Sequence, residues 1–200
     1  DLGLRGIVEQ VGARWQRTYA QRRTFRAGGT LATSYKEATT KQPREDPTDE
    51  LLDLSYTYDF FAVGGERRGL NLGFVRFAIG DNAGELVSRR GGSGATAEGS
   101  YRKLEFSYQR LQGLGDHHAL LLKVDGQTSD DLLASLEQYP IGGPANVRAY
   151  PISQALVDTG GAVTLEWIID APGFADRSLR NTTWGNVFEL SFYADYAGGE

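Results

Sequence analysis

Apolar and polar residues alternate along much of the chain with a period of two. From Phe25 to Lys36 the odd positions carry Phe, Ala, Gly, Leu, Thr and Tyr, whereas the even positions carry Arg, Gly, Thr, Ala, Ser and Lys. Residues 51–60 repeat the pattern, with Leu and aromatic side chains opposed by Asp, Ser and Thr. Because successive side chains of a strand point to opposite faces, this alternation predicts β-strands with one apolar and one polar face.

The same alternation, with local irregularities, predicts eight strands of about ten residues each. The expected strands are residues 6–19, 24–36, 51–61, 69–79, 101–111, 118–128, 162–170 and 186–196. We expect each strand to pair antiparallel with its neighbour in sequence, with the apolar sets on one side. The apolar phase switches after Phe74, which predicts a β-bulge there. No segment has a convincing helical pattern, so the expected fold class is all-β.

Two architectures can hold such strands, a transmembrane β-barrel and a soluble β-sandwich. Strands of soluble sandwiches usually span about 5–6 residues, and the inner face of a sandwich does not tolerate charges. A water-filled lumen does tolerate them. Charged residues recur on the polar face in mid-strand at Arg14, Asp53, Glu105, Asp125, Glu166 and Glu189. Aromatic residues also gather near strand ends, as in an interfacial girdle. These features favour an antiparallel transmembrane β-barrel, with a soluble β-protein as the alternative.

The barrel interpretation assigns the apolar faces of the strands to lipid. The side chains expected on the outer surface are Leu52, Leu54, Tyr56, Leu104, Phe106, Leu120, Leu122, Leu190 and Phe192. The links between strands include long polar stretches, at 37–50 and 80–100, and short ones, at 20–23 and 113–116. Alternating long and short links are expected when one barrel rim faces outward and the other faces the periplasm.

Composition agrees with this picture and limits the chemistry. The chain has 26 Gly, 10 Tyr, 9 Phe, no Cys and no Met, and its net charge is -5. Without Cys, no disulfide or thiolate metal site can form, and the acidic balance is not typical of a nucleic-acid binder. The longest apolar runs fall far short of the roughly 20 residues of a transmembrane helix. Because Met is absent, we expect a processed product, an excised fragment or the ordered part of a longer protein.

Motifs for catalysis or metal binding are weak. His117 and His118 are adjacent, so they point to opposite faces of a strand and cannot chelate one metal ion. Gly91-Gly92-Ser93-Gly94 lacks the spacing of a G-x-S-x-G nucleophile elbow. The acidic residues of 45–50 lie in a Pro-containing link and indicate a solvated rim. We therefore expect no enzymatic activity, no metal and no cofactor.

One segment carries a distinctive motif. Residues 137–166 read EQYPIGGPANVRAYPISQALVDTGGAVTLE. The segment resembles the signature of the TpsB-type two-partner secretion transporters (the haemolysin activation/secretion family), which are relatives of the BamA outer-membrane barrels. Their pattern is (S/E)-x-(Y/F)-x-(I/L)-G-G-x-x-x-V-R-(G/A)-(Y/F), followed by a G-D-x-G step where this chain has VDTGG. The matching residues of the central motif are Gly142, Gly143, Val147, Arg148, Ala149 and Tyr150.

The resemblance implies that residues 137–161 form a signature loop that folds back into the barrel lumen. In this family the Arg of the loop pairs with an Asp in an F-x-D pattern on a nearby strand. Here Tyr193-Ala194-Asp195 offers that pattern with Tyr in place of Phe, so Asp195 is the expected partner of Arg148, and Glu166 or Glu189 is the fallback. A guanidinium in a confined lumen needs such a carboxylate, and a bidentate pair would fix the loop. The alternative is that Arg148 is a solvated loop residue.

Two positions depart from the family pattern. Ala149 replaces the commoner Gly, which removes a position free to adopt a positive φ. Trp167 follows Glu166 where Leu is usual, which bears on the register of that strand.

The resemblance also implies a domain organisation and a function. Residues 1–200 would be part of an outer-membrane β-barrel, with about eight of an expected sixteen strands and without the POTRA domains that capture the exported protein. The implied function is a pore that moves a large partner exoprotein, of haemolysin or adhesin type, across the bacterial outer membrane. The implied partners are that secreted protein and outer-membrane lipid, and not nucleic acid. Two alternatives stay open: a BamA-like outer-membrane protein assembly factor, and a soluble or secreted β-sheet binding module.

Overall fold

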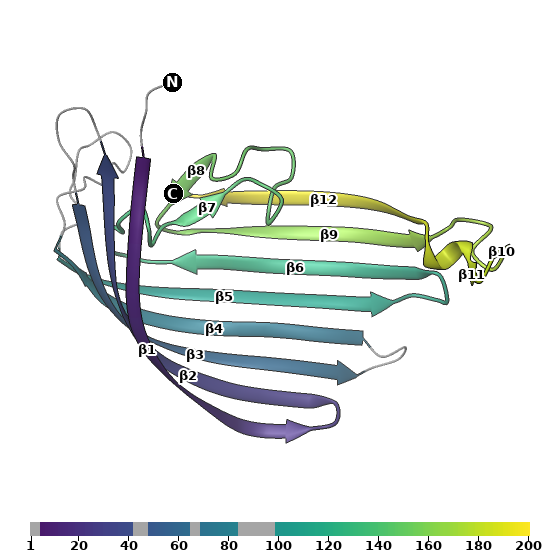
Figure 1. Cartoon of the computed structure of the whole chain (residues 1–200), viewed down its shortest axis with the longest axis horizontal. Coiled ribbons are helices and arrows are strands. Elements are labelled where there is room, and N and C mark those ends of the chain that lie inside the picture. The colour runs from purple at the N-terminus through teal and green to yellow at the C-terminus, as the bar shows by residue number, and fades with distance from the viewer. Residues whose placement is uncertain (1–4, 42–47, 65–68, 84–98) are drawn as a thin grey trace.

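The computed structural model describes residues 5–41, 48–64, 69–83 and 99–200, and one large curved sheet dominates it (Figure 1). Gly91-Gly92-Ser93-Gly94 and the acidic residues Glu45 and Asp46 lie outside the described residues. Within the described ranges, no helix is long and apolar enough to cross a membrane.

Eight long strands form this sheet, in the order β1-β2-β3-β4-β5-β6-β9-β12. Their bounds are β1 (Arg5–Arg22), β2 (Phe25–Lys41), β3 (Thr48–Gly64), β4 (Gly69–Asn82), β5 (Gly99–Gly113), β6 (His118–Thr128), β9 (Gly160–Asp170) and β12 (Glu189–Gly199). Every neighbouring pair is antiparallel. The all-β fold class and the eight expected strands are therefore confirmed.

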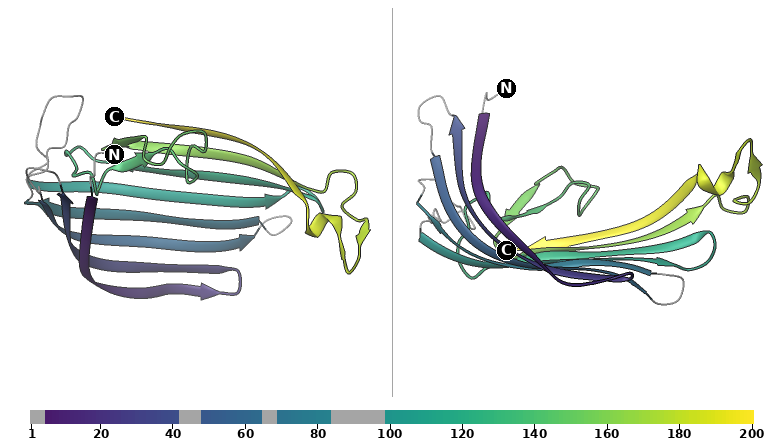
Figure 2. Two further views of the ribbon diagram at one scale, coloured as in Figure 1. Left: turned by 45° about the horizontal axis from the view of Figure 1, so that its top comes forward. Right: turned by 60° about the horizontal axis from the view of Figure 1, so that its bottom comes forward.

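Several strands are longer than the ten or so residues expected. β1 spans 18 residues, and β2 and β3 span 17 each. Pairing continues past the apolar stripes into polar positions, where Glu37 of β2 lies opposite Glu9 and Glu50. Ladder hydrogen bonds use backbone groups, so a polar side chain does not by itself end a strand. In this extended part β1–β3 turn sharply away from the plane of the other strands (Figures 1 and 2).

The expected bulge after Phe74 is wrong. β4 keeps an unbroken register with both β3 and β5. The register shift lies instead in β1, between Thr18 and Ala20. Phe74 and Arg76 are two residues apart, so they point to the same face of β4, whereas Val75 points to the opposite face. Apolar side chains therefore occupy both faces of this strand, and the apolar phase switches although no residue is inserted. A change of phase in the sequence thus reflects which face is apolar, not an inserted residue.

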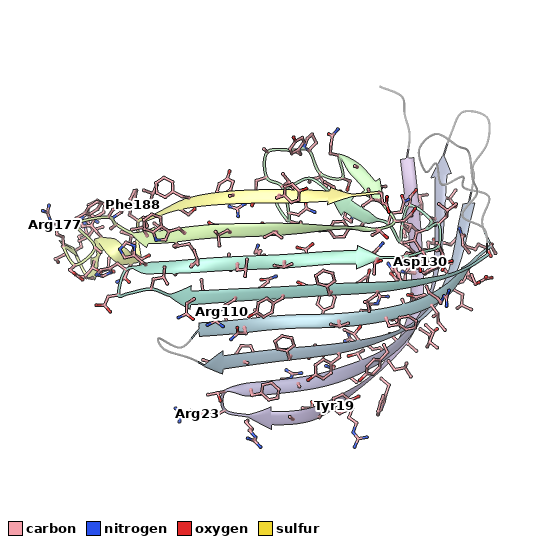
Figure 3. All side chains as sticks on the ribbon, turned by 180° about the vertical axis from the view of Figure 1, so that it is seen from behind. Tyr19, Arg23, Arg110, Asp130, Arg177 and Phe188 are labelled. Atoms are coloured by element: carbon pink, nitrogen blue, oxygen red, sulfur yellow. The ribbon has the colours of Figure 1, made fainter. Side chains whose placement is uncertain are left out.

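The two faces of the sheet differ in what covers them. On the convex face, seven of the nine side chains expected on the outer surface are exposed: Leu52, Leu54, Tyr56, Leu104, Phe106, Leu190 and Phe192. Leu120 and Leu122 are half-buried among neighbours on the same face. Within the described residues no second sheet packs on this face, and the long strands form a single layer (Figure 3).

The remaining elements are short and escaped the sequence analysis. They are β7 (Tyr139–Ile141), β8 (Ala155–Val157), β10 (Ser178–Leu179), β11 (Thr182–Thr183) and a 3-10 turn (Trp184–Asn186). Elements of two or three residues are too short to show a period. β7 and β8 lie in the long connection that starts near Asp130, and β10 and β11 lie near Arg177, at the opposite end of the strands (Figure 3).

Candidate functional site

Residues 129–159, called here the inner loop, connect β6 to β9 and contain the β7–β8 hairpin. The loop lies over the concave side of the sheet instead of extending beyond the strand ends (Figure 2). Its first part is buried there, with Leu133 and Ala134 packed in an apolar cluster with Leu51 of β3 and Tyr101 of β5. The segment that carries the sequence motif is thus folded back against the strands.

Two glycines shape the turn that follows β7. Gly142 and Gly143 have φ values of 105° and 94°, a region that side-chain-bearing residues rarely adopt. A Cβ on Gly142 would also come within 2.3 Å of the carbonyl oxygen of Pro151. The backbone N–H of Gly143 donates to the carbonyl of Tyr150 at 3.0 Å. The Gly-Gly pair therefore allows the chain to reverse tightly around the residues that follow.

Asn146 holds this reversal together, a role that the sequence analysis missed. Its side-chain oxygen accepts hydrogen bonds from the N–H groups of Gly142 at 2.8 Å and Val147 at 2.7 Å. Its amide nitrogen donates to the carbonyl of Pro140 at 2.7 Å. An Asn within a Gly-rich turn is the one available signal, because Asn side chains readily bond local backbone. These bonds fix the backbone just before Arg148.

Arg148 reaches from the loop to β9 and β12. Its Nη2 lies 2.7 Å from Oε2 of Glu166, and its Nε lies 3.4 Å from Oδ2 of Asp195. The backbone N–H of Arg148 donates to the same Oδ2 at 3.2 Å. The guanidinium carbon lies 3.9 Å from the ring centroid of Tyr193. Two carboxylates and an aromatic face therefore hold the guanidinium, a combination that suits Arg better than Lys.

The two strands present these partners from adjacent positions. Glu166 lies opposite Tyr193, and Asp195 lies opposite Thr164. The structure thus brings Arg148 to both Asp195 and Glu166, with the shorter contact to Glu166. Glu189 is not in this group: it lies six residues before Asp195 on β12, about 20 Å along an extended strand, and opposite Asp170 at the other end. The Tyr of the Tyr-x-Asp pattern lies under the guanidinium.

The other signature residues divide into buried and exposed positions. Val147 is buried, whereas Ala149 and Tyr150 are exposed. Among the described non-glycine residues, positive φ occurs at Ser153, Ala171 and Arg180 and not at Ala149, so the Ala that replaces Gly causes no backbone strain. At the second departure, Trp167 faces the convex side, where it stacks on His118, and Glu166 keeps its place on the concave face.

The two ends of the inner loop are joined at its base. Asp158, which is 1% exposed, accepts hydrogen bonds through Oδ1 from the N–H of Leu133 and from Gln138, both at 3.0 Å. The hydroxyl of Thr159 donates to the carbonyl of Ser129 at 3.0 Å. Asp158 and Thr159 belong to the VDTGG step, so this step closes the loop at its base.

The adjacent histidines make contacts in different directions. Nε2 of His117 lies 3.2 Å from Oδ1 of Asp176, and His118 stacks on Trp167 with ring centroids 5.9 Å apart. Among the described residues there is no group of three or more His, Cys, Asp or Glu side chains that could hold a metal ion.

Comparison with known proteins gives a likeness of fold. No family model and no curated protein matches the sequence. Among solved structures, CdiB from Escherichia coli is similar to this chain with a TM-score of 0.68 and 16% sequence identity. The match covers 83% of this chain and 31% of CdiB, so the chain spans about a third of the length of that protein. At this identity the likeness establishes the fold alone: the chain has the antiparallel strand arrangement of part of CdiB.

Proposed function

We propose that this chain forms part of a transmembrane barrel in the bacterial outer membrane, and that the barrel exports a large partner protein by two-partner secretion. The observation that carries the proposal is the placement of Arg148. A loop with the family's signature folds over the concave side, and its Arg meets Glu166 and the Asp of a Tyr-x-Asp pattern. The likeness to CdiB, a transporter of the TpsB family, supports a TpsB-like fold, which is the fold that this proposal requires.

The two faces of the sheet support a membrane location. Leu, Phe, Tyr and Trp side chains project from the convex face without a covering layer in the described residues. A soluble β-sandwich would bury such a face against a second sheet, and a soluble protein rarely leaves so large an apolar surface open. The concave face carries Arg76, Lys103, Glu105 and Glu166 in ion pairs. Apolar outside and charged inside is the arrangement of a barrel in lipid.

A comparison of secreted proteins tests the proposal and separates it from outer-membrane protein assembly. The full-length gene is deleted, and proteins in the medium and in the outer membrane are quantified by mass spectrometry. The proposal predicts that one large secreted protein disappears from the medium while other barrel proteins keep their levels. A general loss of barrel proteins would instead indicate an assembly factor. No change in either fraction would contradict both functions.

A further inference from the structure

Six charged side chains on the concave face form a closed ring in which the sign of the charge alternates. In order round the ring they are Glu137, Lys36, Asp53, Arg76, Glu105 and Lys103. Three cations face three anions, so the ring is neutral as a whole. The Arg148 site does not include any of these residues.

The ring is contributed by four strands and by the inner loop. Arg76 lies 3.0 Å from both Asp53 and Glu105, and Lys103 lies 2.9 Å from Glu105. Lys36 closes the other side, 3.8 Å from Asp53. These five residues come from β2, β3, β4 and β5. Because these five residues belong to the sheet, a movement of the inner loop would not displace them. Glu137 is the one member of the ring that belongs to the inner loop.

Glu137 is bound through both its side chain and its backbone. One carboxylate oxygen lies 2.8 Å from Nζ of Lys103, and the other contacts Nζ of Lys36. Its carbonyl oxygen accepts hydrogen bonds from Lys103 at 3.1 Å and from Gln127 at 2.9 Å. Glu137 is 2% exposed, and the side chain of Lys103 is 3% exposed. This contact is therefore shielded from water much more than the Arg148 site, where the Arg side chain is 24% exposed.

Electrostatics makes Glu137 necessary to the ring. Burial raises the pKa of its carboxyl, but Lys103 and Lys36 outweigh that effect and hold the pKa below its usual value. Without this carboxylate, the ring would keep three cations and two anions. A buried charge without a partner is costly, and water would have to reach the two lysines. The simplest way to admit water is to lift the loop from β2–β5.

The two contacts hold different parts of the loop to different strands. Glu137 attaches the first part to β2 and β5, and Arg148 attaches the middle to β9 and β12. We propose that Glu137 is a second positioning residue of the inner loop, which anchors residues 129–138 to β2–β5 by charge and does so independently of Arg148. The meaning of this anchor for transport rests on the proposed function, whereas the anchor itself does not.

Spin labels at the two attachment points test the inference in the full-length protein reconstituted in lipid. These 200 residues contain no Cys, so single cysteines are placed at the exposed positions Ser135 and Ala145 in full-length protein in which any other Cys is replaced by Ser. We expect Glu137→Gln to change the label at 135 from mainly immobile to mainly mobile and to leave the label at 145 unchanged. Arg148→Gln should have the reverse effect. This readout requires no export, so failure of the proposed function would not alter it.

A second variant separates charge balance from folding. Glu137→Gln combined with Lys103→Gln leaves two cations and two anions in the ring, so the label at 135 should become immobile again. If Glu137→Gln alone fails to assemble, the double variant should still assemble. The matched control is Glu189→Gln, the same change at an exposed carboxylate on β12, which should leave both labels as in the wild type.

Three results would overturn the inference. An immobile label at 135 in Glu137→Gln would mean that apolar packing or backbone hydrogen bonds hold the loop without the charge. Equal mobility at 135 and 145 in that variant would mean that the loop moves as one body. A double variant that stays mobile at 135, or that fails to assemble, would show that charge balance is not the cause.

Discussion

The hydroxyl of Tyr139 in β7 donates a hydrogen bond to the carboxylate of Asp125 in β6. The contact joins the hairpin of the inner loop to the strand that leads into it. Burial, together with the charge and hydrogen bond of Asp125, raises the pKa of the Tyr139 hydroxyl, so it stays protonated and remains a donor throughout the physiological range.

Tyr139→Phe removes this donor and keeps the ring. Hydrogen bonds to charged groups contribute about 1.5–3 kcal/mol, so we expect the amides of Tyr139 and Ile141 to exchange with solvent roughly ten to a hundred times faster. Hydrogen exchange followed by mass spectrometry measures this. Tyr150→Phe is the control, because Tyr150 is 59% exposed. Equal protection of the hairpin in wild type and Tyr139→Phe would show that this bond does not hold it.

Gly142→Ala should loosen the same turn for a different reason. The added Cβ would lie 2.3 Å from the carbonyl oxygen of Pro151, and φ is 105°. Strain of this kind costs of order 1–3 kcal/mol, so the turn should lose protection against proteolysis and hydrogen exchange. Gly173→Ala is the control for the backbone conformation alone, since φ there is 81° and nothing lies within 4 Å of the added Cβ. If both variants have the same small effect, the close approach to Pro151 is not important.

Acid should release the first part of the inner loop. Because the pKa of Glu137 is lowered in the folded protein, its contribution to docking is complete above the unfolded value of about 4.3 and is lost as pH falls through the lower folded value. Lys36 and Lys103 face the Glu137 carboxylate, and Asp53 and Glu105 are the other carboxylates of the ring. A label at position 135 should therefore stay immobile at pH 5 and become mobile only in stronger acid.

The double variant of Glu137 and Lys103, with Gln at both positions, is the control for this pH dependence. In this variant a neutral Gln occupies position 137, so no side chain there changes its charge with pH. The label at position 135 should therefore stay immobile over the same pH range. Release of the wild-type loop between pH 6 and 5, where Glu137 is still ionised, would contradict the account.

Charge on the convex face should be costly if that face meets lipid. Leu54→Arg is expected to lower the free energy of unfolding from lipid bilayers by about 2–4 kcal/mol if Leu54 lies near the bilayer midplane. Thr30→Arg, on the concave face between Gln16 and Thr57, should cost much less, because the proposed barrel would hold this side chain in a water-filled lumen. The measurement is equilibrium unfolding of the full-length barrel in vesicles. Equal costs at the two positions would contradict a lipid-facing convex surface.

The strands could be predicted from the sequence because one face of most of them is apolar. The alternation at Phe25–Lys36 and 51–60 located strands, and their neighbours in sequence became their partners in the sheet. In β4 the strand was predicted but the expected bulge was wrong, because Phe74 faces the concave side and Val75 the convex side of a strand in unbroken register. Strand ends were also missed, since backbone pairing at Glu37 and Glu50 leaves no apolar signal.

The candidate site could be predicted only as far as a motif described it. Asp195 was the expected partner of Arg148, with Glu166 or Glu189 as the fallback, and the structure brings Arg148 to both Asp195 and Glu166. Glu137 lay inside the same motif without an assigned role, because its partners Lys36 and Lys103 are far away in sequence and no local pattern links them. Asn146 and Tyr139 were missed for a similar reason, since their roles depend on the path of the folded loop.

Arg148→Ala tests whether the attachment of the inner loop to β9 and β12 is needed for export. Removal of this partner should loosen the middle of the loop by between about 1 and 3 kcal/mol, between the values for exposed and fully buried ion pairs. The amount of partner protein in the medium is measured in cells that carry wild-type, Arg148→Ala or Glu189→Ala full-length protein at equal levels of assembled barrel. We expect secretion to fall to a small fraction in Arg148→Ala and to stay at the wild-type level in Glu189→Ala. Wild-type secretion by Arg148→Ala would contradict this expectation.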